Sequence, residues 1–242
     1  MDDASRATRF LSIFAEIEKH FRSHFDTGDN RQSFIRMAEL YAQRNRAQRD
    51  LPALRTFADL RNALAHQDYY GGKPVAEPVS DVVAAIERLR NKIIRPPAVL
   101  NVLETREIKL FRPEDKLRDV LEVVRQHDYS QFPVYNGHSY TGLLTTNCIA
   151  RWLAHRLATD ELVEEESVGT AMEFHEPQDR AIHLGRDTTV PEALKKLAPT
   201  SGNGPSPAAL IITHSGVAHE KPLAIVVAGD IPSMFASLDV GS

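Results

Sequence analysis

Along the first 95 residues, apolar positions recur every three or four residues, which is the spacing of amphipathic helices. Small and polar residues at 27–30 separate the first stretch from the second, and Pro96 with Pro97 ends the last. The pattern predicts four helices with short connections. Their apolar stripes are Phe10, Phe14, Ile17, Phe21 and Phe25; Phe34, Met37, Leu40 and Tyr41; Leu54, Phe57, Leu60 and Leu64; and Val79, Val82, Val83, Ile86, Leu89 and Ile93.

Beyond Pro97 the pattern changes to short β-rich runs that alternate with helical stretches of about ten residues. One helical stretch, the strand after it and the next strand–helix junction occur twice, with their apolar positions in register. A Pro-, Gly- and Ser-rich loop, residues 199–207, makes the second copy longer. The aligned segments are residues 115–124 with 188–197, 131–135 with 208–212, and 142–149 with 224–231.

This order of elements predicts an α+β protein, with an all-α unit at residues 1–95 and a repeated βαββα unit at residues 96–242. The first copy is expected at about residues 98–160 and the second at about 166–242. The composition agrees, because 242 residues, 42% hydrophobic and 26% charged, suffice for two small cores.

Cys148 is the only cysteine, which excludes an intrachain disulfide and a cysteine-based zinc site and fits a reducing compartment. No apolar run approaches the roughly 20 residues of a membrane span, and the acidic start Met1-Asp2-Asp3 is unlike a secretory signal. We therefore expect a cytoplasmic protein with no membrane partner and no metal site.

Charge is distributed unevenly between the two parts. Residues 1–95 contain 16 Lys and Arg against 13 Asp and Glu, whereas the remainder contains 13 against 20. A polyanion would therefore approach the helical part. The alternative is an ordinary solvated helix face. The arginines concerned are Arg31, Arg36, Arg44, Arg46, Arg49, Arg55 and Arg61.

The last strand of the repeat reads Gly-apolar-apolar-Thr in the first copy, and Asp-Ile follows three positions after the Thr position in the second. With the Phe-Pro-Val run at 132–134 and the opening at 168–172, this resembles the CBS motif, and two copies in tandem resemble a Bateman module. The resemblance implies two copies packed sheet to sheet around clefts that hold a regulatory adenine nucleotide, such as ATP, ADP, AMP or a cyclic dinucleotide.

In such a motif the Thr hydroxyl bonds phosphate and the Asp carboxylate bonds the ribose hydroxyls. The first copy has Thr145 but carries Cys148 at the Asp position. The second has Asp230 but carries Val227 at the Thr position. A thiol is a poor substitute for a carboxylate, so we expect the Asp230 cleft to be occupied; alternatively, both clefts have lost their ligand and the module only dimerises. The expected nucleotide-site residues are Asp230, Thr145, Phe132, Pro133, Val134 and Ile212.

In the third helical stretch, Arg61 and Asn62 are followed after three residues by His66. This resembles the core of HEPN domains, small helical bundles that often dimerise. The resemblance implies a metal-independent endoribonuclease with Arg61, Asn62 and His66 as catalytic residues and no catalytic cofactor. His66 would take the proton of a ribose 2′-hydroxyl, and Arg61 would stabilise charge on the phosphorus.

Helical geometry constrains this hypothesis. Arg61 is expected among apolar residues, close to Phe57 and Leu64, where a guanidinium requires a partner. Arg61 and His66 lie about 140° apart around the axis, so one helix does not aim both at one phosphate. A homodimer with paired third helices could join them. The alternative is that Arg61 bonds a carbonyl or carboxylate within the bundle and His66 ends the helix.

Two functions follow from these patterns. The first is a homodimeric HEPN-like endoribonuclease that acts on RNA rather than DNA and is regulated by an adenine nucleotide through the junction at residues 90–97. The second is a non-catalytic nucleotide sensor whose helical part dimerises or binds a partner. The patterns do not identify the RNA, the nucleotide, the sign of regulation or a partner toxin or antitoxin.

Overall fold

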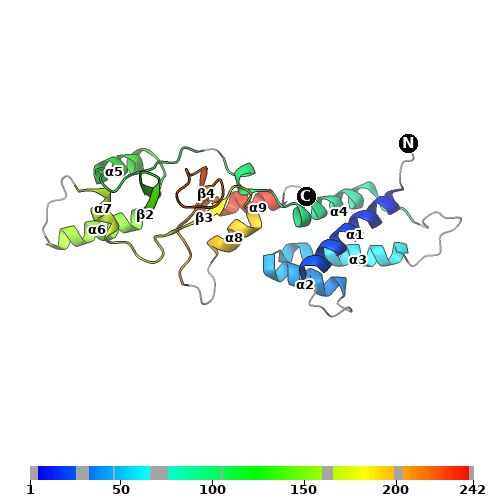
Figure 1. Ribbon diagram of the computed structural model, residues 1–242. Coiled ribbons are helices and arrows are strands. Elements are labelled where there is room, and N and C mark those ends of the chain that lie inside the picture. Colours follow the sequence, from blue (N-terminus) through cyan, green and yellow to red (C-terminus); the bar gives the residue numbers. More distant parts are fainter. Residues whose placement is uncertain are drawn as a thin grey trace. The chain divides into compact units, whose positions relative to one another are not determined.

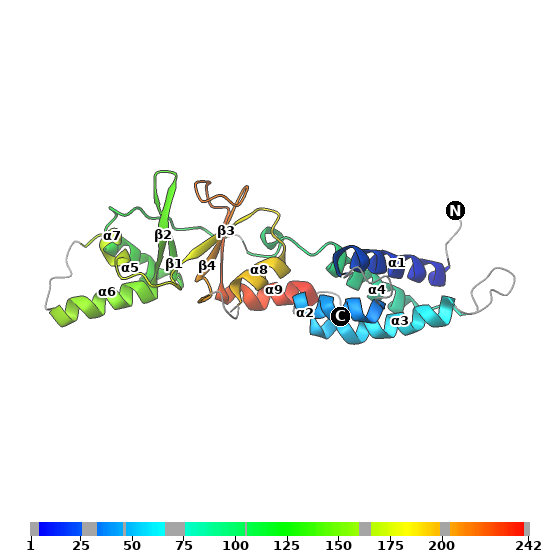
Figure 2. The same cartoon turned by 60° about the horizontal axis from the view of Figure 1, so that its bottom comes forward.

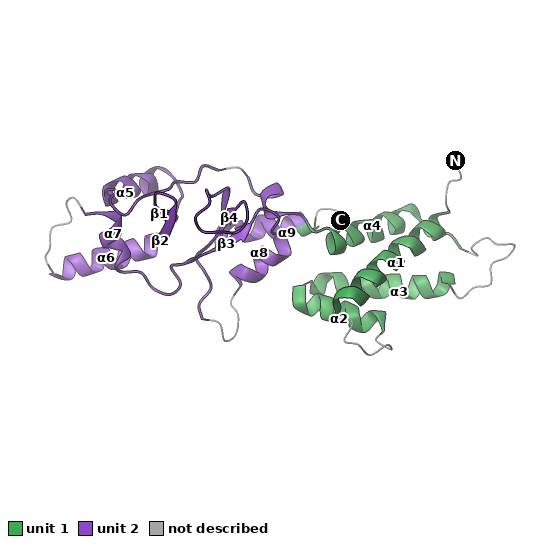
Figure 3. Cartoon of the chain, viewed as in Figure 1, with its two compact units in different colours: residues 1–96, 238–242 green, residues 97–237 purple. Residues whose placement is uncertain are grey.

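The computed structural model describes residues 5–25, 33–45, 47–65, 76–104, 106–159, 166–198 and 204–239. The chain divides into two compact units, residues 1–96 with 238–242 and residues 97–237 (Figure 3). The first unit is helical, and the second mixes helices with two small sheets. The predicted α+β fold class is confirmed.

The helical unit contains the four predicted helices, and α1 contacts each of the other three (Figure 1). Pro52 lies in the first turn of α3, where a missing N–H costs nothing. The elements are α1 (Arg6–Phe25), α2 (Phe34–Asn45), a 3₁₀ turn η1 (Gln48–Asp50), α3 (Leu51–Ala65) and α4 (Ser80–Ile94).

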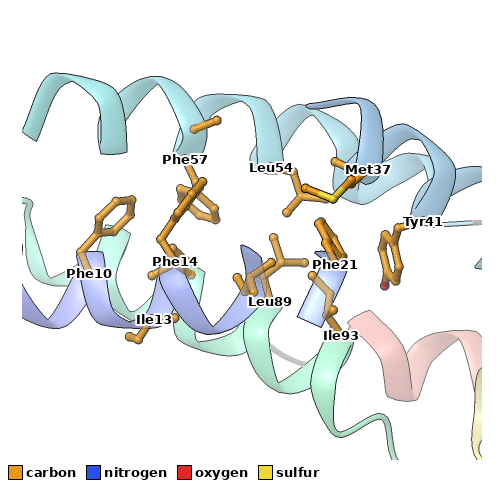
Figure 4. Close-up of a cluster of buried hydrophobic side chains, with 14 of the residues drawn as sticks. Phe10, Ile13, Phe14, Phe21, Met37, Tyr41, Leu54, Phe57, Leu89 and Ile93 are labelled. Carbon is orange, nitrogen blue, oxygen red and sulfur yellow. The ribbon is translucent and has the colours of Figure 1, made fainter. Parts of the chain in front are cut away.

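Aromatic side chains of α1 form the centre of the helical core. Phe10 meets the edge of Phe57 from α3 with ring centroids 5.9 Å apart, and Phe21 lies 5.3 Å from the ring of Tyr41 on α2 (Figure 4). Phe10 and Phe21 are fully buried, as the three-to-four spacing predicts. Rings of this size contribute most of the buried area in a small bundle, so α1 organises the unit.

The second unit contains the repeated elements in their predicted order. Figures 1 and 2 show α5, α6 and α7 gathered around β1 and β2, with α8 and α9 beside β3 and β4. The first copy comprises η2 (Val99–Asn101), α5 (Leu117–Gln126), β1 (Gln131–Asn136), β2 (Ser139–Thr145) and α6 (Thr146–Thr159). The second comprises α7 (Val168–Met172), β3 (Ala181–Gly185), α8 (Val190–Leu197), β4 (Ala209–Thr213), β5 (Ala224–Val227), η3 (Ala228–Asp230) and α9 (Ile231–Asp239).

The two small sheets have equivalent pairings. Strands β1 and β2 form an antiparallel hairpin whose tight turn has Gly137 at φ 60°, and β4 pairs antiparallel with β5. Strand β3 adds to β4 in parallel. In the first copy the corresponding parallel contact is a single bridge between Phe111 and Val134. The repeat is therefore structural as well as sequential, with a shorter third strand in the first copy.

The opening segment of the first copy is hydrogen-bonded to the second copy. The Val99 amide donates to the Thr188 carbonyl at 2.9 Å, and the Val190 amide donates to the Pro97 carbonyl at 2.9 Å. Thr188 and Val190, the residues of the second copy in these two bonds, lie at the start of α8. The start of the second unit is therefore bonded to the second copy, although the elements that follow it in the sequence belong to the first copy.

The opening segment of the second copy makes the reciprocal contact. The Leu117 amide donates to the Glu166 carbonyl at 2.8 Å, and the Val168 amide donates to the Asp115 carbonyl at 2.9 Å. Helix α7 contacts α5, α6 and β2 of the first copy. Each copy thus has its opening segment fixed to the other, an exchange that the linear repeat did not reveal.

Candidate functional site

Asp230 lies in the 3₁₀ turn between β5 and α9, at the predicted strand–helix junction. Its Oδ2 accepts a hydrogen bond from the Val227 amide at 2.8 Å, and its Oδ1 pairs with the guanidinium of Arg106. The Asp230 side chain is 12% exposed and that of Arg106 is 38% exposed. Both carboxylate oxygens are therefore engaged, one by backbone and one by an arginine that no motif had indicated.

Thr145 ends β2 and has a hydroxyl with two partners. It donates to Oδ1 of Asp179 at 2.6 Å and accepts from the Cys148 amide at 3.0 Å. A hydroxyl has only one proton to give, so Thr145 has none for a phosphate oxygen while the Asp179 bond persists. Its expected role as a phosphate ligand stays a prediction, and in this structure the hydroxyl caps α6 instead.

Asp179 is the buried carboxylate around which this junction is built. Its side chain is 2% exposed, and its Oδ2 accepts from Arg151 and from the Glu176 amide. Arg151 also donates to the Phe174 carbonyl at 3.0 Å. A buried carboxylate requires such pairing, because removal of one partner leaves an uncompensated charge. Sequence reasoning missed Asp179, which lies 34 residues from Thr145.

Cys148 is fully buried at the position where the second copy has Asp230. Its thiol donates to the Ala171 carbonyl at 3.1 Å. Burial raises the pKa of the Cys148 thiol, and the neighbouring Asp179 carboxylate adds to this. A Cys148→Asp change would therefore place a second carboxylate in a closed, acidic environment, so this position cannot simply regain a ribose ligand.

The remaining expected lining residues lie inside strands. Phe132 and Val134 are fully buried on β1, Pro133 is buried between them, and Ile212 is fully buried on β4. The Phe132 ring meets the edge of Phe111 with centroids 5.7 Å apart. These four residues form the cores of the two copies, and their contact with a ligand stays a prediction.

An aromatic cluster joins the two copies. His183 of β3 lies over the Tyr140 ring of β2, with centroids 4.6 Å apart, and its Nε2 lies 3.3 Å from the Tyr135 hydroxyl. Burial lowers the pKa of His183 and raises that of Tyr135 to about 12. No local pattern in the sequence indicates this cluster, because its members come from different copies.

In the helical unit, Arg61 is accessible rather than enclosed among apolar side chains. Its side chain is 38% exposed; Nη1 donates to Asn62 Oδ1 at 3.2 Å, and Nη2 lies 4.0 Å from Glu18 Oε2. Its guanidinium carbon also lies 5.9 Å from the centre of the Phe14 ring. The expectation of a buried guanidinium is corrected, because α1 leaves this side of α3 half-open. His66 lies outside the described residues.

The other arginines of the expected basic face also contact groups of the bundle itself. Arg36 and Arg55 both pair with Glu39, at 3.3 and 3.1 Å. Arg44 lies over the Phe25 ring, 5.5 Å from its centroid. These partners reduce the positive potential available to a polyanion. Arg31 and Arg46 lie outside the described residues.

The described part of the chain offers neither a membrane span nor a metal cluster. None of its helices is long and apolar enough to cross a membrane. The same residues contain no cluster of three or more His, Cys, Asp or Glu side chains suited to a metal ion.

Comparison with known proteins identifies part of the second unit. Residues 101–155 match the CBS domain family. Similar solved structures include a CBS domain pair in complex with 5′-methylthioadenosine and S-adenosyl-L-methionine, which is 17% identical over 58% of this chain and 97% of that one, with a TM-score of 0.41. CBSX2 in complex with AMP is 16% identical over 60% and 98%, with a TM-score of 0.42. A CBS-domain containing protein from Agrobacterium tumefaciens is 15% identical over 57% and 92%, with a TM-score of 0.43. A search of curated proteins found no match.

The first prediction concerns the Thr145 hydroxyl. Thr145→Val keeps the side-chain shape but leaves Asp179 Oδ1 and the Cys148 amide without this partner in a buried site. We expect the free energy of unfolding to fall by about 2 kcal/mol or more, measured by urea denaturation. Thr141→Val, at an exposed position of β2, is the matched control and should change stability little. Equal stability of both variants would contradict a capping role for Thr145.

The second prediction concerns His183. Because its folded-state pKa lies below its ordinary value of 6.5, the unfolded chain binds this proton more readily. The stability contributed by neutral His183 is complete above about pH 6.5 and declines as the pH falls below that value. His183→Gln should therefore weaken the acid-side loss of stability, measured by thermal melts between about pH 7.5 and pH 5.

The control for this measurement is His138→Gln, at an exposed turn position of the β1–β2 hairpin. This variant should leave the pH dependence of the melting temperature unchanged. A His183→Gln variant with the same acid-side decline as the unaltered protein would show that the copy–copy contact does not require a neutral imidazole.

Proposed function

We propose that the second unit is a CBS pair that binds one adenine nucleotide per chain at Asp230 and thereby regulates the helical unit. The observation that carries the proposal is the place of Asp230, which follows the last strand of the second copy just as Cys148 follows that of the CBS-matched first copy. In this proposal the nucleotide binds as a regulatory ligand and is not converted as a substrate.

The chemistry at Asp230 suits the sugar of a nucleotide. A carboxylate accepts hydrogen bonds from two adjacent hydroxyls, which a ribose presents at its 2′ and 3′ positions. The N-terminus of α9 begins at the next residue, and helix N-termini favour anions such as phosphate. Sugar and phosphate could therefore be bound at the same strand–helix junction.

The strand–helix junction of the first copy lacks these groups. Cys148 replaces the carboxylate and is buried, and the Thr145 hydroxyl donates its hydrogen bond to Asp179. We therefore propose one occupied cleft in each chain rather than two. The junction between the units, at residues 90–97, would carry the effect of nucleotide binding to the helices.

The third prediction tests this site by calorimetric titration with ATP, ADP, AMP and a cyclic dinucleotide. At least one should bind with a stoichiometry of about one per chain, and Asp230→Asn should weaken it about tenfold or more, because charge-assisted hydrogen bonds to ribose are lost. Asp187→Asn, at an exposed position of the second copy, is the control and should bind as the unaltered protein does. Unchanged affinity in Asp230→Asn would refute the proposed site.

For the helical unit, we propose as a second hypothesis the metal-independent endoribonuclease activity that the HEPN resemblance implies. The observation in its favour is that Arg61 and its hydrogen-bonded neighbour Asn62 are accessible on α3. A homodimer would bring Arg61 of one protomer to His66 of the other around an RNA phosphodiester. The competing function is a sensor without an active site, whose helices dimerise or bind a partner.

The fourth prediction separates these two functions by RNA cleavage in the presence of EDTA. Arg61→Ala should reduce cleavage about a hundredfold while changing the melting temperature little, since the side chain is 38% exposed. His66→Ala should abolish cleavage, and the products should end in a 2′,3′-cyclic phosphate. Cleavage that survives both changes, or a monomeric mass by light scattering, would leave the protein a sensor without this active site.

A further inference from the structure

Arg106 reaches the second copy from the first. It follows η2, whose Val99 amide is hydrogen-bonded to Thr188 of the second copy at 2.9 Å. From this position its guanidinium pairs with Asp230, 124 residues further along the chain. Among the residues that the structure describes, Asp230 is the only acid with which Arg106 forms an ion pair. The opening segment of the first copy, which is bonded to the second copy, therefore places the Arg106 guanidinium beside Asp230, the carboxylate proposed to bind ribose.

A ribose diol that bonds both carboxylate oxygens uses the oxygen atom that Arg106 contacts. Oδ2 of Asp230 is held by the Val227 amide at 2.8 Å, which leaves Oδ1 as the atom that Arg106 contacts. A ribose diol that bonds the carboxylate must displace the guanidinium or share this oxygen with it. Ligand binding and the Arg106 contact are thus in competition.

The cost of this competition depends on the ligand. A guanidinium that leaves a carboxylate loses its counter-charge unless the ligand brings another anion. A 5′-phosphate supplies one, and arginine binds phosphate with paired, charge-assisted hydrogen bonds. A neutral nucleoside supplies none, so its binding leaves Arg106 without an anion.

We propose that Arg106 is the residue that makes the Asp230 site select adenosine phosphates over neutral adenosine compounds. The inference rests on the proposed nucleotide site and specifies its ligand class. Arg106 holds Asp230 in the empty site and exchanges the carboxylate for the ligand's phosphate when a nucleotide binds. A neutral nucleoside is disfavoured because its binding leaves Arg106 without an anion, and a nucleotide is favoured because its phosphate pairs with Arg106.

The arginine at the strand–helix junction of the first copy, Arg151, could not act in this way. Arg151 pairs with the buried Asp179, lies 3.3 Å from Glu176 and donates to the Phe174 carbonyl at 3.0 Å. With these partners it is fixed in the fold. Arg106 is more exposed, at 38% against 29%, and only its pairing with Asp230 would have to change.

The test is calorimetric titration of the full chain with AMP and with adenosine. The unaltered protein should bind AMP at least about tenfold more tightly than adenosine, as expected for a charge-assisted phosphate contact. Arg106→Met should bring the two affinities to within about threefold by weakening AMP binding, while adenosine binds as well as before or better. Arg106→Lys, which keeps the charge but not the planar fork, should retain a reduced preference for AMP.

Arg112→Met is the matched control, because the Arg112 side chain is exposed and its guanidinium lies 4.0 Å from the Glu114 carboxylate. It should keep the full preference for AMP. An unchanged AMP-to-adenosine ratio in Arg106→Met, or an equal loss of both ligands, would overturn the role of Arg106 while the nucleotide site stands. Absence of AMP and adenosine binding in the unaltered protein would overturn this inference, and absence of ATP, ADP and cyclic dinucleotide binding as well would remove the nucleotide site itself.

Discussion

The exchange of opening segments between the two copies is the constraint on which the second unit depends. Four backbone hydrogen bonds fix it: Val99 to Thr188, Val190 to Pro97, Leu117 to Glu166 and Val168 to Asp115. These bonds pair amides and carbonyls at the starts of α5 and α8, where a helix leaves its own groups unsatisfied. Separating the copies would expose all of them, so neither copy is expected to be stable without the other.

The same exchange makes the two strand–helix junctions chemically different. At the junction of the first copy, the segment ahead of β3 supplies an acid, Asp179, which accepts a hydrogen bond from the Thr145 hydroxyl and is neutralised by Arg151. In the second copy the segment after η2 supplies a base, Arg106, which neutralises Asp230. A fully paired, buried carboxylate stabilises the fold, whereas a half-exposed arginine can change partners. The junction at Asp179 is therefore fixed within the fold, whereas the pairing at Asp230 is able to change.

In the helical unit, acidic side chains of the fold itself neutralise several of the arginines. Its arginines suggested a surface for a polyanion, yet Glu39 takes Arg36 and Arg55, and Glu18 lies beside Arg61. Acids on α1 and α2 thus face bases on α3. Among the described arginines, Arg36, Arg55 and Arg61 therefore lie beside acids of the bundle rather than on an uncompensated basic face.

The sequence by itself determined the local elements and their repetition, because helical and strand periodicities depend on residues a few positions apart. It therefore predicted the α1–α4 stripes, the repeated strand–helix junctions and the place of Asp230 after β5. Only the tertiary structure decided that the Thr145 hydroxyl donates a hydrogen bond to Asp179, that Arg106 pairs with Asp230 and that Arg61 is half-exposed beside Glu18. Each of these facts joins residues from different elements, and a side chain's partner is set by how those elements pack, which no local pattern encodes.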